Sequence, residues 1–454
     1  MSVNTEENFL PANQREGSPR SLGFAWAGVM LTPGAIITGM VAAGGASGPG
    51  FFYGFLGLAI GVLLGMAALG VISLWGPKTG LAAMPLARLA FGGAIFIPRI
   101  FLIFSLIAYN GLNDLFGVNA LADSLGISFA LAISCVLVIE ITVVFLGLKA
   151  MRVLGLGISA VMIVISVWLI ISIRDIPAAP IPEGNVGIPM AGIWLAIALG
   201  LSSSISWTVQ ATDLSRTLPE QTSRKPLFLW VFLGSAIPLL VLGGVGAWLS
   251  TNDAILNPMK RVESVLGGGL MSVIALVVMG VALATANGLN DFSGGLSLKQ
   301  MGVRLPRPIA SLIITGLGLC LAIIARNSSI GEVTQDVVLL AGYYTTPWFG
   351  IVIVELLYRR ASIEFLPERA NSAGPAIIAF SAGLLILLPF TATPIGNSLA
   401  AASPMLNWIG WFSRNLMGGA GAGYLVGVLA GATIYAILRR KLINDDSLKN
   451  VSQS

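Results

Sequence analysis

The most regular feature of this chain is a succession of apolar runs, each about 20 residues long and separated by short polar segments. A helix of about 20 residues just crosses the hydrocarbon core of a bilayer. The runs are continuously apolar, whereas strands of a membrane β-barrel would alternate. The pattern therefore predicts an all-α polytopic membrane protein with about twelve transmembrane helices. The expected spans are roughly 22–44, 51–74, 95–116, 127–148, 153–173, 190–212, 226–249, 264–288, 308–325, 336–358, 373–391 and 415–438.

Positive charge is distributed unequally between the two sets of loops. An even number of spans puts both termini on one side, and 20 of the 25 Lys and Arg residues then fall on that side. Because cytoplasmic loops are rich in Lys and Arg, both termini are expected in the cytoplasm, in a protein of the inner or plasma membrane. The net charge of +5 follows from these loops, so we expect the lipid bilayer and no nucleic acid as a partner.

Composition also narrows the chemistry. The chain is 56% hydrophobic and contains no histidine, which excludes a Ser–His triad, a His-ligated metal and a histidine proton relay. The two cysteines, Cys135 and Cys320, lie inside apolar runs without a CxxC partner. No Gly-rich phosphate loop or pair of catalytic carboxylates stands out. We therefore expect neither an enzyme nor a bound cofactor.

Two of the expected spans contain signals that interrupt a helix. Thr32-Pro33-Gly34 lies near the middle of the first span, where Pro removes a backbone donor and Gly loosens the chain. The sixth span contains the stretch 200–204, GLSSS. These spans are five apart and run in opposite directions, as an inverted five-plus-five repeat predicts. A simple proline kink is the alternative for the first span.

The sixth span is unusually polar for a membrane helix. Ser203, Ser204, Ser206 and Trp207 follow one another within five residues. Unwound backbone in a membrane must line a cavity or be buried in protein, and hydroxyls can satisfy both that backbone and a polar ligand. The alternative is that each hydroxyl bonds to its own helix or packs against a neighbour. For consecutive serines beside a Trp, we favour a ligand site.

The loop after the second span, WGPKTGLAAMPLARLAFGG, resembles the first cytoplasmic loop of the nucleobase–cation symporter-1 family. It is most similar to the cytosine permease branch, in which this loop reads G-x-K-T-G-L…L-A-R-x-x-F-G. Two weaker similarities are ATDLSR at 211–216 and the tenth span, with Pro347, Gly350 and Glu355. The matching loop residues are Gly76, Lys78, Thr79, Gly80, Leu81, Leu86, Ala87, Arg88, Phe91 and Gly92.

This resemblance implies a LeuT-type fold: two inverted repeats with discontinuous helices 1 and 6, plus two C-terminal helices, and alternating access driven by a cation. The expected repeats are about 21–173 and 190–360, within a transporter core of 21–360. Two additional transmembrane helices are expected within 361–440, and cytoplasmic tails at 1–20 and 441–454.

The resemblance also implies a substrate site. Relatives hold a nucleobase-like ring between an aromatic residue of span three and a side chain of span six. Tyr109 aligns with the aromatic, and Asn113 lies four residues further on the same helical face. Ser204 aligns with the span-six position, but it cannot stack, so Trp207 is the alternative partner. The substrate-binding residues implied are Tyr109, Asn113, Ser203, Ser204, Ser206, Trp207, Asn287 and Asn290.

Relatives bind Na⁺ between the break in span one and span eight. The aligned positions are Thr32, Ala35, Val281, Ala284 and Thr285, of which only Thr285 would use its side chain. Relatives often carry two adjacent hydroxyls on span eight, and Ala284 replaces one here. The coupling ion is therefore Na⁺ or H⁺.

Three acids lie within or near the spans. Glu140 of span four is a candidate for function because membrane-embedded acids are costly. A protonated or paired structural Glu is the alternative. Asp213 and Glu355 lie nearer the cytoplasmic ends, where pairs with Arg216 or Arg359 are expected.

The sequence favours cation-coupled uptake of a nucleobase or related planar heterocycle, such as cytosine or a purine. The alternatives on the same fold are allantoin or hydantoin, a thiamine-precursor pyrimidine, or an amino acid. A channel or a transporter-like sensor is the alternative from a different class. Paired interrupted helices argue against a channel, and short cytoplasmic segments argue against a sensor.

Overall fold

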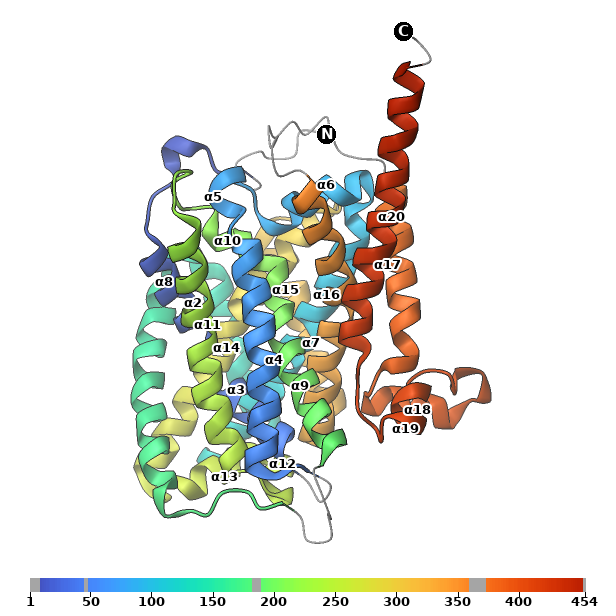
Figure 1. The fold of residues 1–454 in the computed structure, drawn as a ribbon. Helices are drawn as coiled ribbons and strands as arrows, with labels where there is room; N and C mark the ends of the chain where they lie inside the picture. The colour runs from blue at the N-terminus through green and yellow to red at the C-terminus, as the bar shows by residue number, and fades with distance from the viewer. Residues whose placement is uncertain (1–8, 45–47, 182–188, 359–372, 452–454) are drawn as a thin grey trace.

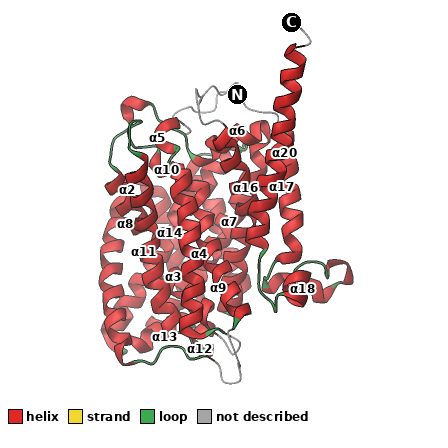
Figure 2. Cartoon of the chain, in the orientation of Figure 1, coloured by secondary structure: helices red, strands yellow, loops and turns green. Residues whose placement is uncertain are grey.

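The computed structural model describes residues 9–44, 48–181, 189–358 and 373–451, but not the side chains of 146–153 and 441–451. Within these ranges the long elements are all helices, packed side by side as a bundle (Figure 1). Figure 2 shows the same bundle coloured by secondary structure, with helices joined by short loops. The described helices confirm the all-α prediction.

The first half of the chain begins with the broken first span. Its elements are η1 (Ala12–Gln14), α2 (Pro19–Met30), α3 (Pro33–Ala43), α4 (Gly50–Ser73), α5 (Gly76–Thr79), α6 (Ala83–Phe91), η2 (Gly92–Ile95), α7 (Phe96–Leu125), α8 (Phe129–Ser172) and η3 (Ile173–Asp175). The fourth and fifth expected spans both lie in α8. The boundary expected between these two spans falls within residues 146–153, whose side chains are not described.

The second half begins with the sixth span. Its elements are α9 (Met190–Ile205), η4 (Ser206–Gln210), α10 (Ala211–Ser215), α11 (Arg224–Trp248), α12 (Asn252–Leu256), α13 (Pro258–Val265), α14 (Gly269–Gln300), α15 (Arg307–Ala325) and α16 (Ile330–Tyr358). They are followed by α17 (Gly374–Leu387), η6 (Leu388–Phe390), α18 (Pro394–Ala402), η7 (Pro404–Leu406), α19 (Trp411–Leu416) and α20 (Gly423–Val451).

Eight helices of the described residues are long and apolar enough to cross a membrane, and two bent pairs raise this number to ten. The other two expected spans correspond to Phe129–Phe145 of α8, which is shorter, and to α20. The segment containing α18 and α19 lies beside the bundle at the lower right of Figure 1, below α17 and α20, because the chain bends by 81° after α17 and η6.

The first helix breaks where the sequence predicts. Thr32 is extended, with φ −122° and ψ 148°, because Pro33 disfavours a helical conformation in the residue before it. Pro33 then starts α3, where its missing N–H costs nothing. The two halves of the span, α2 and α3, meet at 64°.

The sixth helix does not break where the sequence predicts. Residues 200–204 are regular α-helix, and the irregularity is the 3₁₀ segment η4, Ser206–Gln210, one turn later. Hydroxyl groups bond back to the chain here: Ser203 donates to Gly200 O at 3.0 Å and Thr208 to Ile205 O at 2.6 Å. The serines thus satisfy acceptors within a tightened helix, so no full unwinding is needed.

The two expected tails contain regular structure within their described parts. Leu10 N donates to Gly80 O at 2.8 Å, and Phe9 forms a β-bridge with Leu81. Arg15 donates to Leu10 O and to Pro77 O, so the segment is tied to the loop around α5. Burial lowers the pKa of Arg15, and the nearby Glu220 carboxylate opposes this shift. At the other end, α20 remains helical to Val451.

The bundle has two packed groups of helices. On one side α4 packs along α9, and α11 packs along α2, α3 and α4. On the other side α14 packs along α7, α8 and α15. Helix α3 touches α9, α14 and α16, so the broken first span lies between the two groups.

Candidate functional site

Tyr109 of α7 lies where the two groups of helices meet. It is half-buried and packs against both of the large hydrophobic clusters of the core. Its hydroxyl lies 3.5 Å from Ser206 Oγ, at the start of the 3₁₀ segment in the sixth helix. Trp207 follows, half-buried, with its ring edge-on to Trp26 of α2 at 6.1 Å between centroids. The aromatic residue of span three and the irregular part of span six are therefore neighbours.

The consecutive serines of α9 face different helices. A Cβ at Gly342 of α16 would collide with Ser202, and a Cβ at Gly65 of α4 would collide with Ser204. Ser204 is fully buried against α4, with no hydrogen-bond partner for its hydroxyl among the described residues. Of the serines predicted to bind substrate, only Ser206 lies beside Tyr109. The placement of Ser204 therefore does not support its predicted role.

Asn287 of α14 is the centre of a buried polar network. Its Nδ2 donates to Asp114 Oδ1 at 2.7 Å, to Glu140 Oε1 at 2.7 Å and to the carbonyl of Asn110 at 3.2 Å. Its Oδ1 accepts from Asn113 Nδ2 at 2.8 Å. One side chain thus joins α7, α8 and α14.

A second part of the network lies one turn away on α14. Asn110 Nδ2 donates to Asp291 Oδ1 at 2.6 Å, and Thr315 of α15 donates to Asp291 Oδ2 at 2.7 Å. Asn290, predicted to bind substrate, is half-buried in the same turn and makes no side-chain hydrogen bond within the described residues.

The sequence interpretation missed Asp114 and Asp291. The signal that could have found them is a repeated pentapeptide, Asn-Gly-Leu-Asn-Asp, at 110–114 and again at 287–291. The copies lie on spans three and eight, which an inverted repeat of five spans makes equivalent. They pair reciprocally, with Asn110 on Asp291 and Asn287 on Asp114.

The residues predicted to hold Na⁺ are less clearly assembled. Thr32 and Ala35 flank the break in the first helix, where the Thr32 carbonyl accepts from Ala35 N at 3.1 Å. Val281, Ala284 and Thr285 lie in the unbroken part of α14, and Thr285 Oγ1 donates to Val281 O at 2.8 Å. The carbonyls of α14 are therefore already engaged in helical bonds, and the sodium site stays a prediction.

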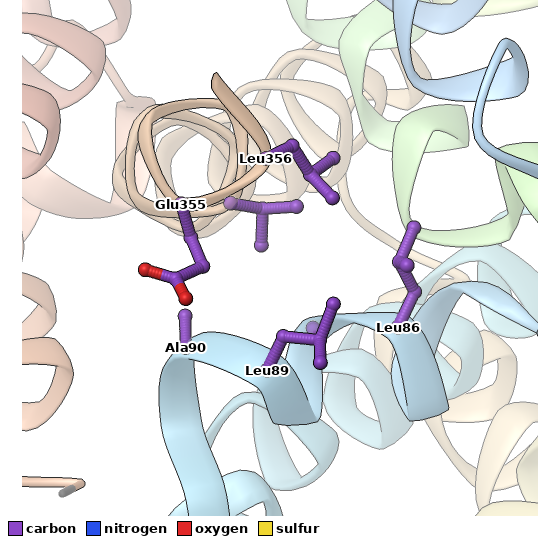
Figure 3. A pocket seen from close by; sticks show the side chains of 7 residues that line it. Leu86, Leu89, Ala90, Glu355 and Leu356 are labelled. Carbon is purple, nitrogen blue, oxygen red and sulfur yellow. The ribbon is translucent and has the colours of Figure 1, made fainter. Parts of the chain in front are cut away.

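Two hollows do not contribute to this site. One, of about 330 Å³, lies between α8 and α14 and has only apolar walls, which include Ile158 and Val278. The other lies between α6 and α16 and is lined by Leu86, Leu89, Leu356 and Glu355, whose carboxylate lies beside Ala90 (Figure 3).

The acids at the predicted cytoplasmic end hold helices together. Glu355 of α16 accepts from Tyr435 at 2.8 Å and pairs with Arg439 of α20 at 3.2 Å. The expected partner Arg359 lies outside the described residues. Asp213 accepts from the backbone N–H of Ala83, the first residue of α6, at 2.8 Å.

Comparison with known proteins agrees with this architecture. The model of a family described as permease for cytosine/purines, uracil, thiamine, allantoin matches residues 9–427. A Bacillus subtilis protein named as a purine-cytosine permease, YxlA, is 21% identical over 95% of this chain and 94% of its own length. The vitamin B6 transporter TPN1 of Saccharomyces cerevisiae is 24% identical over 71% of this chain and 60% of its own length.

Among solved structures, the fold is similar to that of Mhp1, a nucleobase-cation-symport-1 family transporter. The inward-facing form of Mhp1 superposes with a TM-score of 0.71 over 98% of this chain and 94% of that chain, at 18% identity. This similarity confirms the LeuT-type fold expected from the sequence.

Proposed function

We infer that this chain, which belongs to the family of permeases for cytosine/purines, uracil, thiamine and allantoin, imports a nucleobase or a related planar nitrogen heterocycle with a coupling cation. The family and fold make it a multi-span membrane transporter rather than an enzyme. The observation that carries the substrate class is the junction of Tyr109 with Ser206, beside Trp207, where the two groups of helices meet.

This junction offers a planar heterocycle both a surface and an edge. The rings of Tyr109 and Trp207 provide faces or edges for offset stacking. Asn113 lies one turn from Tyr109 and uses its Nδ2 on Asn287, which leaves its Oδ1 to accept from a ring N–H or an exocyclic amine. Aromatic and neutral polar groups suit a heterocycle better than a zwitterionic amino acid, which needs matched charges for its carboxylate and ammonium.

We place the transporter in the cell membrane, with both termini in the cytoplasm. The positively charged loops support this orientation, since Lys78, Arg88 and Arg224 belong to one end of the bundle and Arg261 and Arg326 to the other. The transporter core would then comprise the two repeats at about 21–173 and 190–360.

The test is uptake of a panel of labelled compounds by the wild-type protein: cytosine, adenine, hypoxanthine, uracil and allantoin. Pyridoxine belongs in the panel because a relative is a vitamin B6 transporter. The planar heterocycle that inhibits labelled uptake at the lowest concentration is identified as the substrate. Uptake of none of them would contradict the proposed function.

The site is tested with variants of α7. Tyr109→Ala and Asn113→Ala should each raise KM by about 5- to 150-fold, the equivalent of about 1–3 kcal/mol for lost stacking or one lost buried hydrogen bond. Tyr109→Phe keeps the ring and should keep most of the affinity. Asn119→Ala, on the same helix but remote from Tyr109, is the matched control. Normal uptake by both alanine variants would show that the substrate binds elsewhere in the protein.

A further inference from the structure

Three carboxyl groups belong to one buried hydrogen-bond network between α7, α8 and α14. Asp114 and Asp291 come from the two copies of the repeated pentapeptide, and Glu140 comes from α8. Asp114 is 1% exposed, and Glu140 and Asp291 are 0% exposed. They are joined by the amides of Asn110 and Asn287, which are also 0% exposed. We refer to these five residues as the carboxyl cluster.

Among the described side chains of α7, α14 and α15, no positive charge lies close enough along its helix to compensate these acids, and the side chains of Lys149 and Arg152 on α8 lie outside the described part of the chain. The nearest basic residues along α14 and α7 are Lys299, eight residues from Asp291, and Arg99, fifteen residues from Asp114. At 1.5 Å per residue these separations are about 12 and 22 Å. Arg307 of α15 stacks on the ring of Phe292 at 4.2 Å and is also eight residues from Thr315. Helix α3 carries no ionisable side chain.

Tyr109, one turn before Asn113 on α7, has its hydroxyl 3.5 Å from Ser206 Oγ and makes no hydrogen bond to these acids within the described residues. An uncompensated carboxylate in such a place costs several kcal/mol. Three of them cannot all be ionised together, so the cluster must carry protons or bind a cation.

The polar atoms of the cluster indicate which of these it holds. Asp114 Oδ1 and Glu140 Oε1 each lie 2.7 Å from the same nitrogen, Asn287 Nδ2, so the two carboxyl groups are neighbours, and like carboxylates this close are not both ionised. Asp114 Oδ2, Glu140 Oε2 and Asn110 Oδ1 receive no donor from the described residues, so each can take part in a bond to a carboxyl proton. Asn110 Oδ1, on a fully buried side chain, is thus free to accept from a protonated carboxyl. The described acids do not group as a three-ligand metal site.

We propose that the carboxyl cluster binds the coupling proton of this transporter, shared between Asp114 and Glu140 and exchangeable with Asp291. This inference rests on the proposed function, and it names the coupling ion. Asn287 contacts both carboxyls of the pair and also Asn113, the amide assigned to substrate. Proton and substrate are therefore linked through a single side chain.

The same geometry explains how the proton affects conformation. When the proton leaves, two adjacent carboxylates remain on different helices, α7 and α8, and their repulsion disfavours the packed arrangement. Because Asn110 and Asn287 tie the two repeats together at equivalent positions, a change at either carboxyl alters the contact between the repeats. Rearrangement between repeats is the basis of alternating access in this type of fold.

The first experiment separates coupling from substrate transport in proteoliposomes containing the wild type, Glu140→Gln, Asp114→Asn or Asp291→Asn. We expect the wild type to accumulate substrate when the outside is more acidic. In Glu140→Gln and Asp114→Asn this accumulation should fall at least about tenfold. Counterflow exchange at equal pH should persist in both variants, because exchange needs no net proton movement. Asp123→Asn, an exposed acid on the same helix α7, is the control. Accumulation driven by Na⁺ at equal pH and unchanged in these variants would overturn the proposal.

The second experiment needs no substrate. A proton held in the folded cluster is released on unfolding at any pH above about 4–5, where free carboxyl groups ionise. The folded state then binds more protons, so stability falls as pH rises. The Tm of purified wild type should therefore drop between about pH 5 and 9, and Glu140→Gln should flatten this dependence.

The two experiments fail in distinguishable ways. If the wild type transports none of the panel but shows the pH-dependent Tm that Glu140→Gln removes, the substrate class is wrong and the proton site stands. If Tm has the same pH dependence in the wild type and in Glu140→Gln, the proton site is wrong, whatever the substrate.

Discussion

Replacement of Asn287 by alanine is the sharpest test of the buried network. Asn287 is fully buried, and its amide contacts three acceptors and one donor on two other helices. The amide has two N–H hydrogens, so it satisfies two of the three acceptors fully, and its oxygen makes a third bond. Asn287→Ala removes these three bonds and leaves Asp114 and Glu140 each without an amide donor.

The expected cost follows from interhelical bonds in other membrane proteins. Such bonds average about 0.6 kcal/mol and reach about 1.7 kcal/mol, so three of them amount to about 2–5 kcal/mol. The upper part of this range is expected because the acceptors left without a donor are fully buried carboxyl groups. Asn287→Asp keeps the size but turns the donor into an acceptor, so it should be as destabilising as alanine at neutral pH and less so at acidic pH.

The assay is unfolding in mixed micelles, with the folded fraction followed as the share of denaturing detergent increases. Asn290→Ala is the matched control, because Asn290 lies one turn away on α14, is half-buried and has no side-chain bond within the described part of the chain. We expect Asn290→Ala to change uptake more than stability. An Asn287→Ala variant no less stable than Asn290→Ala would refute the view that this network holds α7, α8 and α14 together.

Three further variants test packing, the C-terminal helix and the alternative ion. A Cβ at Gly246 of α11 would collide with the carbonyl of Ile36 in α3, so Gly246→Ala should lose about 1–3 kcal/mol of unfolding free energy, whereas Gly316→Ala, which meets open space, should lose none. Arg439→Gln removes the cation that pairs at 3.2 Å with the buried Glu355 carboxylate of α16 and should cost about 1–3 kcal/mol, a value reduced because Arg439 is still 17% exposed. Substrate affinity at fixed pH should ignore Na⁺ in both wild type and Thr285→Val; a Na⁺ dependence that Thr285→Val reduces would instead establish the sodium site.

Local features of the sequence were enough to predict the spans and the first break. A continuous apolar run has no stable place in water, so its length and position fix a membrane helix with little help from distant residues. The break at Thr32-Pro33 is equally local, since proline restricts its own backbone and that of the residue before it. The loop motif at 76–92 identified the family for the same reason: its residues are adjacent in the chain.

The tertiary structure decided which polar side chains act together. The serines of the sixth span look alike in sequence, yet Ser204 lies against α4 and Ser206 lies beside Tyr109, because each faces a different neighbour around the helix. The irregular segment of that helix is at Ser206–Gln210 and not at the predicted 200–204, because hydroxyl bonds and close packing keep the serine stretch helical.

The carboxyl cluster likewise depends partly on the sequence and partly on the tertiary structure. The sequence contains both copies of the Asn-Gly-Leu-Asn-Asp pentapeptide, and Glu140 was recognised as an unusual membrane acid. The antiparallel packing of α7 on α14, with α8 beside them, brings Asp114 next to Glu140. The same packing lets Asn110 and Asn287 each bind the aspartate of the other copy. The burial of the three acids and their distance from any compensating charge both depend on that packing. The acids are spread over 178 residues of sequence, from Asp114 to Asp291, and they form one site only in the folded protein.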